Sequence, residues 1–360
     1  MCIAHLTDQL DSAATNVFAQ KLLEHCNAAA IGMMISIGHR TGLFDVMADG
    51  QPITTKDLAE KAELSERYIR EWAGAMVTGG VLEYRESDNT YRLPLEHAAS
   101  LTRAATPNNL ASVFQWIAVL GSVEDQVVEA FRHGRGVPYS AYRRFNEVMA
   151  EESGQTVVAA LEEHILPLAP GLRERLEEGV AVVDVGCGRG RALMHLATLF
   201  PASRFTGLDF LEDAINDATV EAAERGLTNI TFRQQDAATW DESQKYDVVF
   251  TFDAVHDQAR PDRVLDNIRR ALKPGGMYLM QDILGSSYVQ KNVEHPMAPF
   301  IYTISCMHCM SVSLANEGMG LGAMWGRETA TRMLKQAGFP EVRVQTLPHD
   351  VLNYYYIKPV

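Results

Sequence analysis

The stretch 180–191 constrains the fold of this chain more than any other part of its 360 residues; it reads Val-Ala-Val-Val-Asp-Val-Gly-Cys-Gly-Arg-Gly-Arg. Its valines form a β-branched run that is typical of a buried strand in a parallel sheet. Gly186, Gly188 and Gly190 follow at once, and an apolar helical pattern begins at Ala192. The stretch predicts a strand, a glycine turn and a helix, which together let backbone approach a bound ligand closely.

The spacing of these glycines distinguishes two classes of ligand. A dinucleotide site has the pattern G-x-G-x-x-G and holds a pyrophosphate at the helix N-terminus. Here the third glycine comes one residue early, Arg191 stands in place of the last one, and Asp184 would repel a diphosphate. S-adenosylmethionine (SAM) has no phosphate, and its ammonium and sulfonium cations suit a carboxylate. We therefore predict a SAM site, with a nicotinamide oxidoreductase and a turn without ligand as the alternatives.

Two more carboxylates follow predicted strands. Asp209 ends the strand 205–209, and Asp236 follows the strand 229–232. Because ligands of open α/β sheets bind at the carboxyl ends of the strands, we expect Asp209 to accept the ribose hydroxyls and Asp236 the adenine amino group. Cys187 is expected to be a small packing residue of the turn and not a nucleophile. The predicted cofactor contacts are Asp184, Gly186, Cys187, Gly188, Gly190, Asp209, Phe210, Asp236, Ala237 and Phe252.

A candidate base follows the next predicted strand, 246–252. His256 is the best general base in the chain, because the ordinary pKa of an imidazole lies near neutrality. Asp257 is the predicted residue that orients it. We predict no metal site, because Cys306-x-x-Cys309 has no second ligand pair with metal spacing nearby.

The first hundred residues have the pattern of a winged helix. A helix starts at Thr54-Thr55, a second one follows Ser65, and the segments 81–85 and 90–93 form a hairpin. This part has 8 Lys and Arg against 14 Asp and Glu, whereas phosphate contact needs a basic face. We therefore expect dimerisation or a substrate cap, and not DNA binding. The small residues of 28–34 indicate either core or a dimer contact.

Charge, cysteine content and domain division are properties of the whole chain that further limit its possible functions. A net charge of −14 argues against nucleic acid and against an anionic membrane surface. No basic segment precedes an apolar run at the N-terminus, so we expect no signal peptide. Scattered cysteines favour a reducing, cytoplasmic compartment. We predict three parts: a winged-helix domain (1–100), a helical connector or cap (101–178) and a SAM-binding domain (179–360).

These motifs carry a family resemblance. The segment 180–284 resembles class I SAM-dependent methyltransferases, and the whole chain is similar to bacterial-type methyltransferases with an N-terminal winged-helix domain. The resemblance implies an α/β, Rossmann-like, seven-stranded sheet with a reversed last strand, and often a homodimer. The pair His256-Asp257 is similar to that of small-molecule O-methyltransferases, in which the His deprotonates the acceptor hydroxyl. Those enzymes normally carry Trp next, where this chain has Gln258.

The predicted function is therefore SAM-dependent methyl transfer to an oxygen or sulfur nucleophile of a small molecule. The alternative is a winged-helix transcriptional regulator that responds to SAM without catalysis. Such a regulator would need a basic recognition surface.

Overall fold

The structure is a computed structural model that describes residues 10–348 and 350–358. It divides into two compact units, Met1–Ala118 and Val119–Val360. The helical stretch 119–178 thus groups with the α/β unit. The predicted boundaries at residues 100 and 178 stay predictions.

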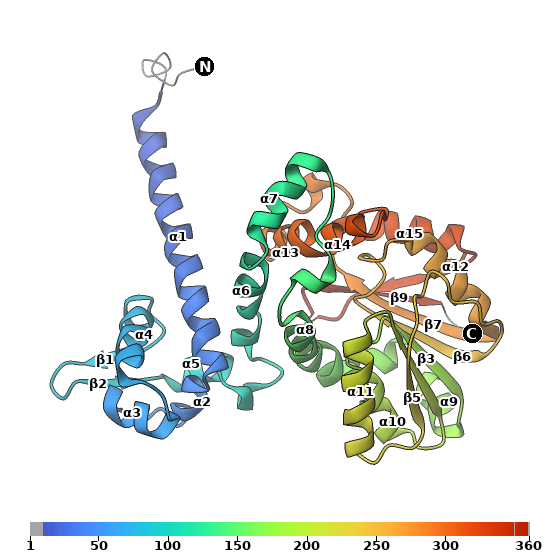
Figure 1. Cartoon of the computed structure of the whole chain (residues 1–360), viewed down its shortest axis with the longest axis horizontal. Helices are drawn as coiled ribbons and strands as arrows, with labels where there is room; N and C mark the ends of the chain where they lie inside the picture. Colours follow the sequence, from blue (N-terminus) through green and yellow to red (C-terminus); the bar gives the residue numbers. More distant parts are fainter. Residues whose placement is uncertain (1–9, 349, 359–360) are drawn as a thin grey trace. The chain divides into compact units, whose positions relative to one another are not determined.

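The first unit contains the winged helix (Figure 1). Its helices are α1 (Ser12–Arg40), α2 (Leu43–Val46), α3 (Thr55–Ala62), α4 (Glu66–Thr78) and α5 (Leu95–Leu101), and its hairpin is β1 (Glu83–Arg85) with β2 (Thr90–Arg92). As the sequence predicts, Thr54 caps α3 by accepting the Asp57 N–H at 3.2 Å. The predicted winged helix is confirmed.

Trp72 of α4 centres the core of this unit. Its ring packs edge-on against Phe44 at 5.5 Å between centroids, and its Nε1 donates to the Met34 carbonyl at 3.0 Å. The carboxyl-terminal part of α1 thereby joins the core. Gly32 is buried, whereas the alanines at 28–30 are exposed. Within the run 28–34, the amino-terminal alanines therefore lie at the surface, and the core begins near Gly32.

The second unit is built on a seven-stranded sheet in the order β5-β4-β3-β6-β7-β9-β8. The first five of these strands run parallel, and β9 is antiparallel to both neighbours. This is the predicted Rossmann-like sheet with a reversed last strand. The strands are β3 (Ala181–Val185), β4 (Arg204–Asp209), β5 (Ile230–Gln234), β6 (Tyr246–Phe252), β7 (Leu272–Ile283), β8 (Arg343–Gln345) and β9 (Asn353–Lys358).

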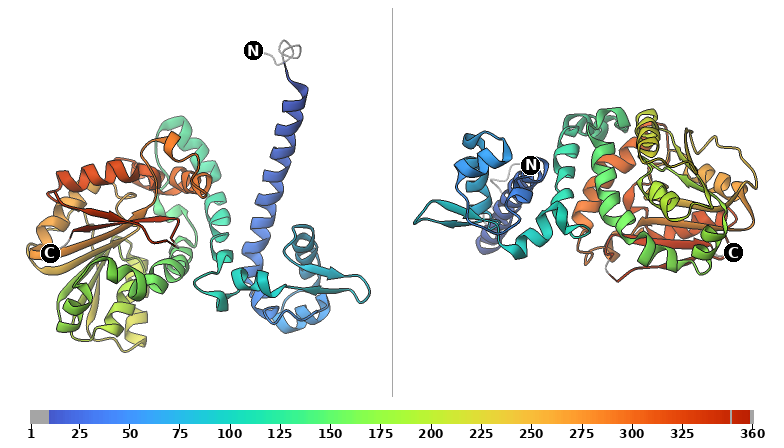
Figure 2. Two further views of the ribbon diagram at one scale, coloured as in Figure 1. Left: turned by 180° about the vertical axis from the view of Figure 1, so that it is seen from behind. Right: turned by 90° about the horizontal axis from the view of Figure 1, so that it is seen from below.

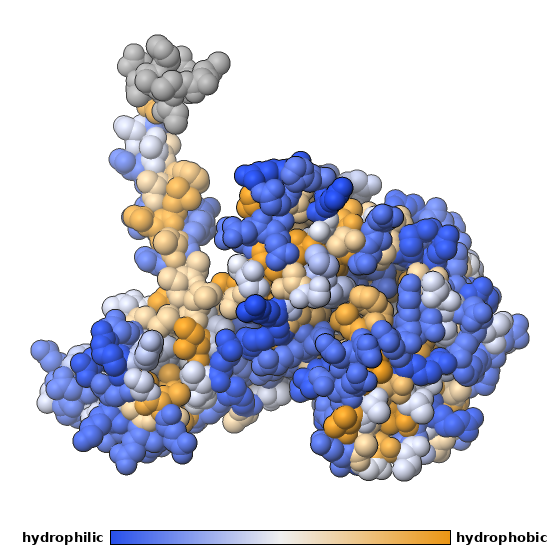
Figure 3. Space-filling view, viewed as in Figure 1, coloured by the Kyte–Doolittle hydropathy of each residue, from blue (hydrophilic) through white to orange (hydrophobic). Residues whose placement is uncertain are grey.

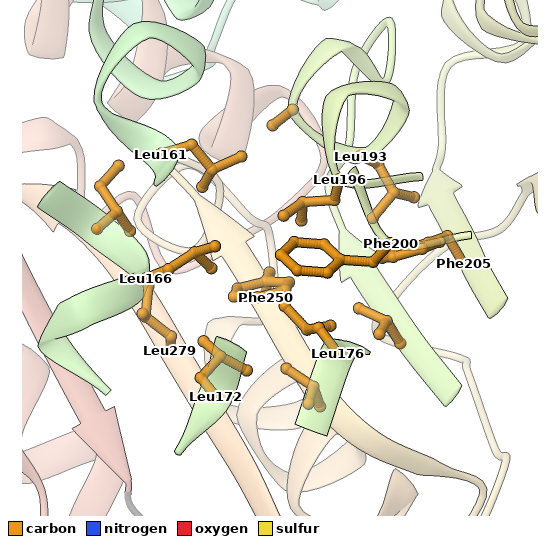
Figure 4. Packing of buried hydrophobic residues seen from close by; sticks show 14 of the residues in the cluster. Leu161, Leu166, Leu172, Leu176, Leu193, Leu196, Phe200, Phe205, Phe250 and Leu279 are labelled. Carbon is orange, nitrogen blue, oxygen red and sulfur yellow. The ribbon is translucent and has the colours of Figure 1, made fainter. Parts of the chain in front are cut away.

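Helices cover both faces of this sheet, because successive strand residues point to opposite sides. Val182 and its neighbours pack with α9 (Leu172–Glu178) and α10 (Arg191–Leu199), and Ala222 of α11 (Glu212–Glu224) joins them. Figure 4 shows Phe200 and Phe250 in this core among leucines of helices and strands. The opposite face, with Val183, packs under α12 (Pro261–Ala271) and α15 (Gly326–Gln336). Both layers are needed to bury a parallel sheet.

Helices that precede the first strand of the sheet lie together with helices from the segment between β7 and β8 (Figure 2). They are α7 (Glu124–His133), α8 (Phe145–Ser153), α13 (Ala298–Ile304) and α14 (Met310–Ala315), while α6 (Gln115–Gly121) contains the boundary of the units. The contact is close: Val137 N donates to Ser311 Oγ at 2.8 Å. A Cβ on Gly136 would come within 1.7 Å of the Ser311 carbonyl oxygen, so this position requires glycine.

The helical segment Ala298–Ala315 is long and apolar enough to cross a membrane by length and composition. It is 44% buried inside the protein, and the core helix of a globular protein has the same composition. Two of its residues, Ile301 and Cys309, form a small buried cluster with Met324, which lies in the short helical turn Ala323–Trp325. We therefore interpret it as a core helix of this unit.

Candidate active site

The carboxyl ends of β3 to β7 open on a cavity of about 540 Å³. All ten residues predicted to contact a cofactor line this cavity, and so does Asp257. His256 is not among the lining residues and is only 2% exposed. The sheet therefore brings the predicted cofactor residues together around the cavity. His256, the predicted base, is buried behind the residues that line it.

The glycine turn after β3 needs its glycines. Gly186, Gly188 and Gly190 have φ of +79°, +52° and +68°, a region that L side chains rarely adopt. A Cβ on Gly190 would also lie 2.3 Å from the Phe232 ring. At Gly188 a Cβ would meet nothing within 4 Å. The turn therefore packs closely against the sheet at Gly190, whereas Gly188 leaves space for a ligand beside the backbone.

Asp209 fastens this turn to β4. Its Oδ2 accepts the Gly188 N–H at 2.8 Å, and its Oδ1 accepts the Leu211 N–H at 2.9 Å. The Phe210 N–H is a third backbone donor to this carboxylate. Because a carboxylate accepts about four hydrogen bonds, Asp209 has a fixed orientation and still has acceptor capacity for a ligand.

Asp184 is the buried acid of the site. It is 2% exposed, and its Oδ1 has no hydrogen-bond partner. Burial, reinforced by the charge of Asp209, raises the pKa of Asp184 to about 8. A buried acceptor without a donor is costly unless a ligand satisfies it. A cationic ligand such as SAM fits this position.

The adenine end of the predicted site lies beyond β4 and β5. Phe210 is 47% exposed, so one face of its ring is available to a ligand. Asp236 Oδ1 accepts the Ala238 N–H at 2.8 Å, which fixes the carboxylate. Phe252, at the end of β6, stacks on Phe250 with the ring planes 16° apart.

His256 pairs with Asp282, which lies next to the end of β7. The distance from His256 Nδ1 to Asp282 Oδ1 is 3.0 Å, and Asp282 is fully buried. Burial alone lowers the pKa of His256, but Asp282 and then Cys309 outweigh it, so its pKa lies well above the ordinary value. Asp282, and not the predicted Asp257, holds the imidazole, because adjacent residues of the turn after β6 point in different directions.

Asp257 faces a different partner. Its Oδ2 accepts a hydrogen bond from the Tyr139 hydroxyl, 118 residues away in the chain. The Tyr139 ring also packs against Phe210, with the centroids 5.7 Å apart. Burial, then the charge of Asp257, raises the pKa of Tyr139 well above its ordinary range, so the hydroxyl stays protonated. Tyr139 therefore spans the cavity wall from the cofactor residues to Asp257.

Four residues of the site were not predicted from the sequence: Tyr139, Asp253, Gln281 and Asp282. Asp253 and Gln281 line the cavity, and Asp282 holds His256. The rule that located Asp209 and Asp236 also locates these residues, since they lie where β6 and β7 end. Tyr139 has no such signal, because it lies in a short helical turn far from the sheet strands in sequence.

By spacing, Asp253, His256 and Asp282 could also surround a metal ion, as one ligand atom of each lies within 4.8 Å of the others. Asp282 Oδ1, however, already accepts Trp325 Nε1–H and the Ile283 N–H, each at 2.8 Å. Together with His256 these donors fix Asp282 Oδ1, whereas the buried Oδ2 has no hydrogen-bond partner. We therefore describe the group as a hydrogen-bonded pair beside Asp253.

Two family models match the chain. Residues 29–103 match an Rv2258c-like winged HTH domain, and residues 176–338 match a methyltransferase domain. The fatty-acid O-methyltransferase of Mycolicibacterium smegmatis is 34% identical over 105 residues, which are 29% of this chain and 38% of that protein. The chain spans 38% to 59% of the length of the first curated relatives that it matches.

Solved structures share the fold over nearly the whole chain. The mitomycin 7-O-methyltransferase MmcR superposes with a TM-score of 0.70 at 18% identity, over 97% of this chain and 100% of that one. Human N-acetylserotonin methyltransferase in complex with SAM gives a TM-score of 0.67 at 18% identity, over 98% and 99%. With its winged helix, its glycine turn and its reversed last strand, the chain combines a winged HTH domain and a methyltransferase domain in the fold of class I SAM-dependent methyltransferases.

Proposed function

We propose that this protein transfers the methyl group of SAM to an oxygen or sulfur nucleophile of a small molecule. The observation that carries the proposal is the cavity at the strand ends, where the glycine turn and three carboxylates meet. The buried, unpartnered oxygen of Asp184 favours a cationic ligand over a diphosphate. The names of the matched relatives, among them a fatty-acid and a mitomycin O-methyltransferase, support methyl transfer to oxygen.

The residues of the cavity have distinct proposed roles. Asp209 and Asp236 bind the ribose and adenine, with Phe210 against the base, and Asp184 faces the cationic end. When bound, SAM supplies an activated methyl group. The chain's own residues then orient the acceptor, exclude water and accept a proton.

We retain a proposed catalytic role for both His256 and Asp257, but the two residues act in different ways. Asp257 lies on the cavity wall and, with Tyr139, bounds the space for the acceptor. His256 lies behind the wall, 3.7 Å from Asp253 Oδ1. From there it promotes proton removal through its charge on Asp253, and Asp282 holds its position.

The regulator alternative is less well supported. Arg67 and Arg70, the arginines of α4, pair within that helix with Glu71 and Glu66 at 2.6 and 2.7 Å. A recognition helix for DNA uses such cations on phosphates. We therefore retain a cap or dimerisation role for the winged helix, and a cytoplasmic location stays part of the proposal.

Calorimetric titration with SAM and with S-adenosylhomocysteine (SAH) tests the function. We expect the wild type to bind both, and Asp209→Ala to lose at least about tenfold in affinity, or about 1.4 kcal/mol. Asp213→Ala, an exposed acid of α11, is the control and should bind as the wild type does. No SAM binding by the wild type would end the proposal.

The pH dependence of SAM binding should report Asp184. Since the pKa of Asp184 is about 8 in the free protein, a cation binds better as that carboxylate ionises. Between pH 7 and 8 the ionised fraction rises roughly fivefold, so affinity should rise by about that factor and a proton should be released. In Asp184→Asn, any remaining dependence of SAM affinity on pH comes from ionisation of SAM itself and of other groups in the protein. An identical slope in both proteins would contradict this role.

His256→Ala separates catalysis from cofactor binding. We expect turnover to fall by about tenfold or more, because Asp253 loses its charged neighbour. Because His256 lies outside the cavity, the dissociation constant of SAM should stay within about threefold. Steady-state kinetics and calorimetry on the same preparation make the measurement. Equal turnover would remove His256 from the mechanism.

A homodimer through α1 is part of the proposal. The amino-terminal half of α1 exposes apolar side chains: Val17 is 71%, Phe18 61% and Leu23 60% exposed. Figure 3 shows apolar surface along this helix, and patches of this kind mark protein interfaces. Light scattering should give twice the chain mass for the wild type and the monomer mass for Phe18→Glu/Leu23→Glu. A monomeric wild type would exclude the dimer.

A further inference from the structure

Asp253 lies between two halves of the cavity: the half assigned to the cofactor and a second half at the ends of β7 and β9. Nine of the ten residues assigned to the cofactor follow or end β3, β4 and β5, and Phe252 ends β6; the cavity continues past the ends of β6, β7 and β9. Asp253 follows β6 directly, and Gln281 on β7 and Asn353 on β9 come next. On the proposed function, on which this inference rests, this second half receives the methyl acceptor.

The second half offers hydrogen-bond acceptors that lack donors. Asp253 Oδ1 and Gln281 Oε1 are both covered by the protein and have no hydrogen-bond partner. Asp257 differs from them, because it already accepts the Tyr139 hydroxyl and, at 3.4 Å, Gln258 Nε2. Asp253 lines the cavity, and its Oδ1 lies 3.7 Å from His256 Nδ1 without accepting a hydrogen bond, so we assign this carboxylate to the ligand.

Three of the four arginines on the cavity wall are engaged elsewhere. Arg189 pairs with Asp217 at 3.1 Å, and Arg260 pairs with Asp262 at 2.7 Å. Arg191 donates to the Ala150 carbonyl at 2.9 Å. The fourth, the exposed Arg263, lines this cavity and also borders a second pocket beside Ala238 and Thr239. Beside Asp253 and Asp257 an anionic acceptor would meet two carboxylates, and the cation next to them, His256, already pairs with Asp282 at 3.0 Å.

The backbone holds Asp253 in place. Its φ of +54° lies in the left-handed region, which is uncommon for a residue other than glycine. Its N–H donates to the Gln281 carbonyl at 3.0 Å, which ties it to β7. Burial, opposed by the charge of His256, raises the pKa of Asp253 to about 8. A carboxylate with a pKa near the working pH is suited to accept a proton.

We propose that Asp253 binds the acceptor through an O–H donor and takes its proton during methyl transfer, which selects hydroxyl acceptors over carboxylates. The acceptor oxygen forms a bond to the methyl carbon while the sulfur–carbon bond breaks. The electron pair of that bond stays on sulfur, and the proton moves to Asp253. His256 acts only as the charged neighbour of Asp253.

Matched acceptors and an isosteric variant test this assignment. Wild type, Asp253→Asn and the exposed-acid control Asp213→Asn are each given 4-alkylphenols and 4-alkylbenzoates of equal chain length. Labelled methyl transfer gives kcat/KM, and calorimetry gives the affinities for SAM, for SAH and, in the SAH complex, for both acceptor series. Thermal unfolding checks that each variant is folded.

We expect wild type and Asp213→Asn to prefer the phenols by at least about tenfold in kcat/KM. Asp253→Asn should lose about a hundredfold in phenol turnover, with SAM and SAH affinities within about threefold of wild type. If Asp253→Asn does not fold, the wild-type preference alone decides.

Four outcomes would overturn the inference while SAM still binds. They are a preference for benzoates, neither series bound or methylated, undiminished phenol turnover in Asp253→Asn, and a loss of SAM but not SAH affinity in that variant. The last would mean that Asp253 holds the cofactor's sulfonium. Failure of the wild type to bind SAM would instead overturn the proposed function itself.

Discussion

The glycine turn is held to β4 by three backbone N–H groups, and the site depends on this attachment. Gly186 and Cys187 both donate to the Leu208 carbonyl, and Gly188 donates to the Asp209 carboxylate. The turn thereby extends the parallel hydrogen bonding of β3 and β4 beyond the sheet edge. One residue, Asp209, consequently shapes the loop and presents acceptor oxygens to a ligand. Structure and binding cannot be separated at this position.

Covered carboxyl groups are the second organising feature of the cavity. Asp184 and Asp253 each have a covered oxygen that accepts no hydrogen bond, and burial raises the pKa of both to about 8. Because the unfolded chain ionises these groups at lower pH, they reduce the stability of the free protein increasingly as the pH rises toward about 8. A cation or a hydrogen-bond donor in the cavity removes this penalty. The covered carboxyl groups thus favour a ligand that brings a cation or a hydrogen-bond donor.

Much of this architecture is predictable from the sequence because it rests on periodic and local rules. The valine run, the glycine spacing and the acids after strands located the sheet and the cofactor half, and the caps at Thr54 and Ser65 located the winged helix. The partner of His256 was not predictable, because side-chain direction after β6 depends on a turn that includes a left-handed Asp253. Tyr139 reaches Asp257 only through tertiary packing, which no local pattern in the sequence encodes.

The ring of Tyr139 is shared between both halves of the cavity. Its edge lies near Phe210 on one side, and its hydroxyl is bound to Asp257 on the other. Any displacement of the ring by an occupant of one half changes the shape of the other half. Occupancy of the two halves is then thermodynamically linked, and the linkage is equal in both directions. A single aromatic side chain can therefore couple the affinities of two ligands for one cavity.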